Sequence, residues 1–262
     1  RTTLYLTDAS NYDNWVTALA WDQEQGSLLF QGEYHARNPI YRISLSDRKP
    51  VPLLTDGSIA SWKTADGGST VVYERRTIDS PPEIFRFDSK TGNSTRLTNF
   101  NKDLVSEVDL RTAEEMWVQG AGDYKVHVFV IKPHAFDPAK KYPLILNVHG
   151  GPQSQWMDNY RGDWQVYPGK DYVVAFANPT GSTGYGQDFT AAISKDWGGR
   201  VFKDLMLVTD ALENLPYVDK ERMGSMGWSF GGYMVMWFQG HTTRFRASAA
   251  MMGVYNLTSM YG

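Results

Sequence analysis

The chain has 262 residues, a length that fits one large domain or two smaller ones. Its 26 basic and 29 acidic side chains leave a net charge of -3, which is too even a balance to favour binding of nucleic acid or an anionic membrane surface. No window approaches the roughly 18 uninterrupted apolar residues that membrane insertion requires. The absence of cysteine excludes a disulfide framework, a thiolate metal site and a cysteine nucleophile.

The opening stretch RTTLYLTDAS has neither an initiator methionine nor the basic and then apolar layout of a signal peptide, so we expect the true start to lie upstream. Residues 16–99 then predict an all-β region. Short β-branched and aromatic segments alternate there with clusters of Asp, Gly, Asn and Pro, as in strands joined by turns. The clearest segments are SLLFQGEY, PIYRISL, STVVYERR and EIFRFDS.

This β region contains an internal repeat with an offset of about 43 residues, a period typical of propeller blades. Each copy begins near a tryptophan, Trp21 or Trp62, and ends in Leu-Thr-Asp or Leu-Thr-Asn. Two copies cannot close a propeller, so we expect further blades before Arg1 and interpret residues 1–107 as the C-terminal blades. An ordinary β-sandwich is the alternative.

Residues 108–262 predict strands that alternate with helices. The apolar runs YPLILNVHGG and YVVAFANPTG indicate two buried strands, and RMGSMGWS and FRASAAMMGVY indicate two more. Between them, RVFKDLMLVTDALENLP repeats apolar residues at helical spacing until Pro216, and FGGYMVMWFQGH suits a buried helix. This alternation predicts a mostly parallel sheet. The turns HGGPQSQ, NPTGSTGYG and WSFGG follow strands, so we expect them at the sheet's carboxyl edge, where open α/β sheets place their sites.

The stretch GWSFG around Ser229 satisfies the pattern G-x-S-x-G, in which small residues let a strand turn sharply into a helix and present the serine above the sheet. A predicted strand before it and a predicted helix after it supply the required setting, so we predict Ser229 as a nucleophile. The alternative makes Ser229 a helix cap among packing glycines.

Acyl transfer at Ser229 also needs hydrogen-bond donors for an oxyanion. The amide of Phe230, directly after the serine, is the expected first donor, and the amide of Gly150 or Gly151 in the turn HGGP is the candidate second donor. His149 in that turn is ambiguous, because a histidine that closes a buried strand is more often a structural hydrogen-bonding residue than a catalyst.

The sequence favours neither a cofactor nor a metal. The glycine-rich turn NPTGSTGYGQDF lacks the Lys-Ser/Thr of a P-loop and the glycine order of a dinucleotide fold. The histidines show no paired ligand spacing. They are His35, His127, His134, His149 and His241.

The motifs GWSFGGY, NVHGGPQSQW, NPTGSTGYGQDF, DWGG and VTDALENLPYVDKERMG, in this order, resemble the catalytic domain of the prolyl oligopeptidase family of serine peptidases. The resemblance covers residues 108–262 and implies an α/β-hydrolase fold preceded by a β-propeller. The turn HGGP is similar to that of the dipeptidyl peptidase V and acylaminoacyl peptidase branch.

The resemblance implies Ser229 as the nucleophile, the Phe230 amide as an oxyanion donor, and an apolar P1 pocket to which Tyr255 and Tyr261 contribute. His149 replaces a family tyrosine, which leaves open whether a side chain in the substrate pocket or only the Gly150 amide completes the oxyanion hole. Thr180 also departs from the family pattern, where an arginine is frequent.

The base that would activate Ser229 is not evident in the chain. α/β hydrolases place the triad aspartate and histidine after the serine, and only His241 follows. Twelve helical positions put His241 about 18 Å from Ser229, beyond hydrogen-bond reach. We therefore expect the acid and the base beyond Gly262, the C-terminal part of the hydrolase domain to be missing, and the chain alone to be nearly inactive.

The leading functional hypothesis is a serine exopeptidase that releases N-terminal dipeptides with an apolar or alanine P1 residue, through an acyl-enzyme. Acylaminoacyl-peptidase or esterase chemistry is the alternative within enzymes, and a non-catalytic binding protein is the alternative of another class. A dipeptidyl peptidase needs an anion for the substrate's free amino group, for which Glu33 and Glu74 are weak candidates. The resemblance suggests a periplasmic or secreted protein, with the cytoplasm as the alternative.

Overall fold

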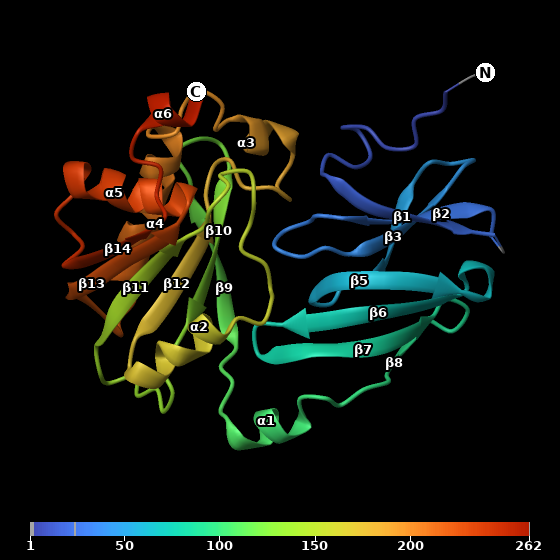
Figure 1. The fold of residues 1–262 in the computed structure, drawn as a ribbon, viewed down its shortest axis with the longest axis horizontal. Coiled ribbons are helices and arrows are strands. Elements are labelled where there is room, and N and C mark those ends of the chain that lie inside the picture. Colours follow the sequence, from blue (N-terminus) through green and yellow to red (C-terminus); the bar gives the residue numbers. More distant parts are fainter. Residues whose placement is uncertain (1–2, 24, 262) are drawn as a thin grey trace. The chain divides into compact units, whose positions relative to one another are not determined.

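The computed structural model describes residues 3–23 and 25–261, and the chain divides into two compact units (Figure 1). The β unit comprises Arg1–Leu110 together with two short segments from later in the chain, Met157–Tyr160 and Thr183–Gln187. The α/β unit comprises Arg111–Trp156, Arg161–Ser182 and Asp188–Gly262. The main division falls close to the expected boundary at residue 107, whereas the two short segments were not predicted from the sequence.

The β unit contains two four-stranded antiparallel sheets, in which each strand pairs with the next along the chain. The first sheet has the order β1-β2-β3-β4, and the second has the order β5-β6-β7-β8. The sequence repeat therefore corresponds to one sheet per copy. The strands of the first sheet are β1 (Val16–Asp22), β2 (Ser27–Gly32), β3 (Ile40–Ser44) and β4 (Pro50–Leu54). Those of the second are β5 (Ser58–Ala65), β6 (Thr70–Thr77), β7 (Ser80–Asp88) and β8 (Asn93–Arg96), with a short 3-10 turn at Asp66–Gly68.

Apolar side chains from both sheets form one core in the β unit. Leu29 and Ile40 of the first sheet pack with three side chains of the second sheet, and all five are buried. The three are Ile59, Val71 and Phe87. The β-branched and aromatic residues that predicted the strands thus supply the apolar area that holds the two sheets together.

A buried carboxylate, Glu83 on β7, anchors the chain as it leaves the second sheet. Glu83 is 2% exposed and accepts hydrogen bonds from the Thr98 hydroxyl and from the amides of Phe100 and Asn101, and it pairs with Arg96 at 3.0 Å. Burial acts to raise the pKa of Glu83, but these hydrogen bonds outweigh it and lower the pKa to about 2. The ionised carboxylate is therefore part of the folded structure.

The α/β unit is built on a six-stranded mixed sheet with the order β14-β13-β11-β12-β10-β9. β11, β12, β13 and β14 run parallel, and β10 pairs antiparallel with both β12 and β9. The predicted parallel sheet is present and carries this antiparallel extension at one side. The strands are β9 (Ala113–Gln119), β10 (Lys125–Ile131), β11 (Tyr142–Val148), β12 (Val173–Asn178), β13 (Val218–Trp228) and β14 (Ala247–Met251).

Helices cover the sheet of the α/β unit. The longer ones are α4 (Arg200–Glu213) and α5 (Phe230–His241), which pack with the inner side chains of β10, β11 and β12 in one core. The predicted face of α4 is buried through Val201, Leu205, Val208 and Leu212. No helix in the described part of the chain is long and apolar enough to cross a membrane. The shorter helices are α1 (Lys102–Glu107), α2 (Gly162–Val166), α3 (Gln187–Ala191) and α6 (Leu257–Tyr261), with a 3-10 turn at Pro168–Lys170.

Alternation along β12 divides its side chains between two layers. Ala175 and Ala177 belong to the core with α4 and α5, whereas Phe176 between them stacks on Trp164 of α2 at a ring distance of 3.8 Å. Trp164 is fully buried. A strand buried on both faces explains why YVVAFAN reads as a continuous apolar run.

We expect Glu83→Gln to destabilise the β unit by about 1–3 kcal/mol at neutral pH, because the amide cannot satisfy the donors that face a carboxylate. The pKa of Glu83 is lowered on folding, so its contribution is present above the unfolded-state pKa and is lost as pH falls toward 2. Thermal unfolding of wild type and variant between pH 2 and 7 measures this. The difference between the two proteins should shrink as the solution is acidified, and a constant difference would contradict the assignment.

Candidate active site

Ser229 occupies a sharp turn between β13, which ends at Trp228, and α5, which begins at Phe230. Its backbone angles, φ 57° and ψ -117°, lie in a sparsely populated region for a residue other than glycine. The turn is held at both sides, because the Ser229 amide donates to the Met251 carbonyl at 2.9 Å and the Tyr233 amide donates to the Ser229 carbonyl at 2.9 Å. The predicted strand, turn and helix are all present at this position.

The glycines around Ser229 are required by close backbone approach. A Cβ atom on Gly227 would lie 2.4 Å from the Gly231 carbonyl oxygen, and one on Gly231 would lie 2.1 Å from the Val148 carbonyl oxygen. A Cβ on Gly232 would lie 2.7 Å from the Met251 carbonyl oxygen. The helix therefore starts directly against the ends of neighbouring strands β11 and β14, which leaves no room for a side chain.

The cap alternative for Ser229 is not supported. Ser229 is the residue before α5, but its side chain makes no capping hydrogen bond. Phe230 is the first residue of α5, so its amide has no acceptor within the helix, and the helix N-terminus adds partial positive charge beside Ser229. The hydroxyl and this amide are thus available for a ligand.

The turn HGGP reaches Ser229 from the neighbouring strand. β11 and β13 pair in parallel with Val148 opposite Gly227, so both strands end at the same edge of the sheet. A Cβ on Gly150 would lie 3.2 Å from the Ser229 Cβ. The next residue, Gly151, has φ +124° and is exposed. The structure therefore places Gly150 beside the candidate nucleophile, with Gly151 next in the chain.

His149 is closed off from any substrate pocket. Its side chain is 4% exposed, and its two ring nitrogens contact the Gly150 carbonyl oxygen at 2.7 Å and the Ser182 hydroxyl at 2.9 Å. Burial lowers the pKa of His149 to about 4, opposed only by the contact with Gly150, so the ring is neutral near neutral pH. Of the two roles open from the sequence, the geometry favours the structural one.

An open cavity of about 380 Å³ lies on the exposed side of Gly151. Trp197 contributes to its lining and also contacts Phe230 edge-on at a ring distance of 5.2 Å. Trp197 thus lies between this cavity and the residue that follows Ser229. The lining residues are Gly151, Pro152, Gln153, Ile193, Ser194 and Trp197.

The predicted P1 pocket residues do not line this cavity. Tyr255 is 88% exposed and Tyr261 is 96% exposed, and neither lies in the lining of the cavity beside Gly151. Their part in a P1 pocket stays a prediction.

Thr180, the departure from the family pattern, is paired with a buried carboxylate. Asp204 on α4 is fully buried and accepts hydrogen bonds from the Thr180 amide at 2.8 Å and from the Thr180 hydroxyl. Its other oxygen accepts from the Ala121 amide at 2.7 Å. Sequence reasoning missed Asp204, although an aspartate next to the apolar face of a predicted helix was a detectable signal. The pair fixes the turn after β12.

No described histidine contacts Ser229. His241 lies at the far end of α5 and hydrogen-bonds the Trp237 carbonyl oxygen at 2.8 Å through Nδ1. Among the residues that the structure describes, no group of three or more His, Asp or Glu side chains could hold a metal ion.

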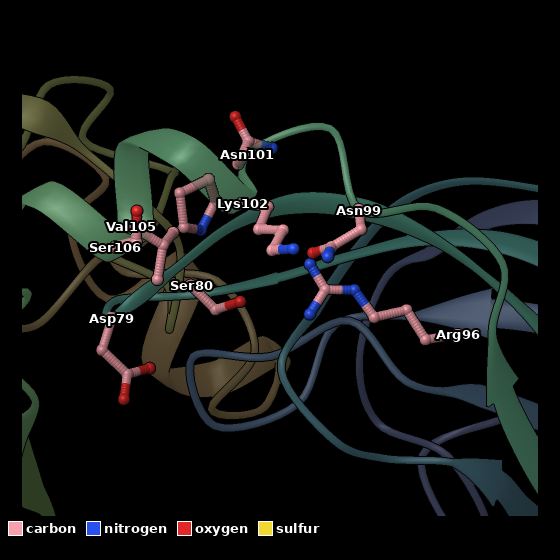
Figure 2. A pocket seen from close by; sticks show the side chains of 9 residues that line it. Asp79, Ser80, Arg96, Asn99, Asn101, Lys102, Val105 and Ser106 are labelled. Carbon is pink, nitrogen blue, oxygen red and sulfur yellow. The ribbon is translucent and has the colours of Figure 1, made fainter.

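The β unit has a cavity of its own, shown in Figure 2, of about 210 Å³. Arg96, Asn99 and Lys102 come together on one side of it, and Asp79 lies apart from them. Arg96 is already engaged with Glu83 and the Thr98 carbonyl oxygen. This cavity holds no nucleophile paired with a base.

Glu33 and Glu74, the two candidate anchors for a substrate's amino group, differ in their hydrogen-bond and ion-pair partners. Glu74 lies 3.9 Å from Arg76, whereas Glu33 has one buried carboxylate oxygen without a hydrogen-bond partner among the described residues. Burial raises the pKa of Glu33. The raised pKa favours the neutral acid, so it is the unpartnered oxygen alone that makes Glu33 the stronger candidate of the two for binding a cation.

A serine presented on a strand-turn-helix at the carboxyl edge of a mixed sheet defines the α/β-hydrolase class. Residues 158–262 match the model of the prolyl oligopeptidase family. Across 97% of its length, the chain is 31% identical to dipeptidyl-peptidase 5 of Schizosaccharomyces pombe and 32% identical to that of Trichophyton equinum, of which it covers 38% and 36%.

Solved structures of two peptidases share the fold of this chain. Acylaminoacyl peptidase of Pyrococcus horikoshii matches 95% of this chain with a TM-score of 0.85 at 23% identity, and 39% of that chain is covered. A putative dipeptidyl aminopeptidase IV of Bacteroides ovatus matches 95% with a TM-score of 0.80 at 26% identity, with 36% covered. The chain is thus similar to the prolyl oligopeptidase family over residues 158–262, and it spans well under half the length of these relatives.

Gly231→Ala should destabilise the α/β unit by about 1–3 kcal/mol, because its new methyl group meets the fixed Val148 carbonyl. Gly240→Ala in the same helix is the matched control, since a Cβ there finds nothing within 4 Å and alanine favours a helix. Chemical denaturation compares the two variants. Equal stability of the two would contradict the steric account of the turn.

Proposed function

We propose that the full-length protein carrying this chain is a serine peptidase that cleaves short peptides through an acyl-enzyme on Ser229. One observation carries the proposal. Ser229 stands in a strained turn at the start of α5, with Gly150 of the neighbouring turn beside its side chain. The relatives named dipeptidyl-peptidase 5 support the same reaction class.

In this proposal the Ser229 oxygen attacks the peptide carbonyl, and the amides of Phe230 and Gly151 stabilise the oxyanion. The proton of Ser229 must pass to a base, and His241 is bound elsewhere. We place the base and its orienting carboxylate in the part of the full-length protein that relatives have and this chain does not span.

The β unit fits a role as blades of a β-propeller. Its two successive four-stranded antiparallel sheets match the sequence repeat, one sheet per copy. We therefore assign residues 1–107 to a propeller domain and 108–262 to a hydrolase domain, with further blades in the full-length protein.

The substrate class has two candidates. Relatives named dipeptidyl-peptidase 5 favour release of N-terminal dipeptides, and the acylaminoacyl peptidase neighbour favours blocked N-termini. Free and N-acetylated versions of one chromogenic peptide separate them. We expect the free peptide to have the higher kcat/KM, and faster cleavage of the acetylated peptide would contradict the dipeptidyl-peptidase assignment.

Ser229→Ala in the full-length protein should lower kcat at least about a thousandfold, because the nucleophile is removed. It should also abolish labelling by a fluorophosphonate probe while the unfolding temperature stays near that of wild type. Ser225→Ala, in the preceding strand, is the control that should keep the labelling. A wild-type protein that neither labels nor cleaves peptides would instead favour the non-catalytic binding protein.

A further inference from the structure

A chain of polar contacts runs from the turn after β12 to the HGGP turn, all within the α/β unit. The Ser182 hydroxyl lies 2.9 Å from Nε2 of His149, and Nδ1 of His149 lies 2.7 Å from the Gly150 carbonyl oxygen. Ser182 and His149 are both buried, at 0% and 4% exposure. Neither side chain takes part in the two backbone hydrogen bonds that hold the turn at Ser229.

The protonation of His149 follows from its partners. A carbonyl oxygen can only accept, so Nδ1 carries the hydrogen and donates it to Gly150. Burial keeps the ring neutral, since it lowers the pKa of His149 to about 4. Nε2 is then unprotonated and lies 2.9 Å from the Ser182 oxygen, while the Ser182 hydroxyl also donates to the Pro179 carbonyl oxygen at 2.7 Å, so its one hydrogen is shared between two acceptors.

The contact with Gly150 orients the next amide. The peptide between Gly150 and Gly151 is trans, and in a planar trans peptide the C=O and N–H bonds point in opposite directions. A carbonyl held toward the buried imidazole therefore turns the Gly151 N–H away from it. Gly151 is exposed, and within the described residues its amide has no hydrogen-bond partner. This amide is free to meet a ligand.

The two glycines of the HGGP turn, Gly150 and Gly151, need a hydrogen bond that restrains their backbone. Gly151 has φ +124°, and two adjacent glycines give the turn more backbone freedom than other residues would. An oxyanion donor is effective only when it is fixed before the charge develops. A hydrogen bond to the Gly150 carbonyl supplies that restraint.

We propose that His149 is a positioning residue that holds the Gly150 carbonyl and thereby aims the Gly151 amide at the oxyanion, with the Ser182 side chain in contact with the other ring nitrogen. This inference rests on the proposed peptidase function and deepens it. His149 acts through the backbone and does not touch the substrate.

The support behind Ser182 is itself rigid. The Ser182 amide donates to the Pro179 carbonyl at 3.0 Å, and the Thr190 hydroxyl donates to the Ser182 carbonyl at 2.9 Å. Asp204 holds Thr180 in the same turn. These hydrogen bonds connect the loop that contacts the imidazole to Asp204 on α4.

Two substitutions of His149 separate its two nitrogens. His149→Asn keeps an N–H at the position of Nδ1 and so can still donate to Gly150, whereas His149→Gln places its amide near the position of Nε2 and cannot. In the full-length protein, His149→Gln should lower kcat about 10–100-fold with little change in KM, because the lost restraint acts on the transition state. His149→Asn should stay within about fivefold of wild type.

The affinity for a peptide aldehyde inhibitor distinguishes this positioning role of His149 from a merely structural one, which would leave that affinity unchanged. The aldehyde forms a hemiacetal whose oxygen occupies the oxyanion position, so its Ki should rise in His149→Gln in parallel with the fall in kcat. Unfolding temperatures confirm that both variants are folded. Equal losses in the Asn and Gln variants, or a loss in KM alone, would overturn the proposal.

Ser182→Ala provides a second route if the His149 variants do not fold. It should lower kcat severalfold in the wild-type background, since the imidazole loses the contact that holds Nε2 at 2.9 Å, and an unchanged kcat would overturn the proposal. A wild-type enzyme without peptidase activity would refute the proposed function itself. An active wild type with an equally active His149→Gln would refute only the role of His149.

Discussion

The contact between Gly231 and the Val148 carbonyl is the constraint on which the site depends. The first turn of α5 lies so close to the end of β11 that no side chain fits between them. This approach places Ser229 in its strained conformation and puts the turn after β11 beside it. Strain of this kind persists only where the surroundings fix the backbone, and here two neighbouring strands do so.

The polar contacts complement this steric constraint. Glycines give the two turns their shape but also leave them flexible, so other groups must hold them. Asp204 fixes the turn after β12, and Ser182 and His149 connect that turn to Gly150. Buried polar groups are favourable only when they have partners, and the Asp204 carboxylate meets this condition by accepting from Thr180 and from the Ala121 amide.

Local patterns predicted much of the fold and part of the site. Period and composition identified the strands of both units and the buried face of α4, and G-x-S-x-G identified the elbow at Ser229. The pairing of Thr180 with Asp204 could not be predicted, because the two residues come from different elements and meet only through tertiary packing. For the same reason the sequence left the role of His149 open. The family resemblance implied a P1 pocket at Tyr255 and Tyr261, which the structure leaves exposed.

The central claim is that Ser229 forms a covalent intermediate with a peptide carbonyl. Acid quenching of the full-length protein during turnover of a peptide ester, followed by peptide mass spectrometry, tests this most directly. The account predicts an acyl group on the segment that contains Ser229, formed at the rate of turnover. Rapid turnover with no adduct on Ser229, or with the acyl group on another residue, would contradict it.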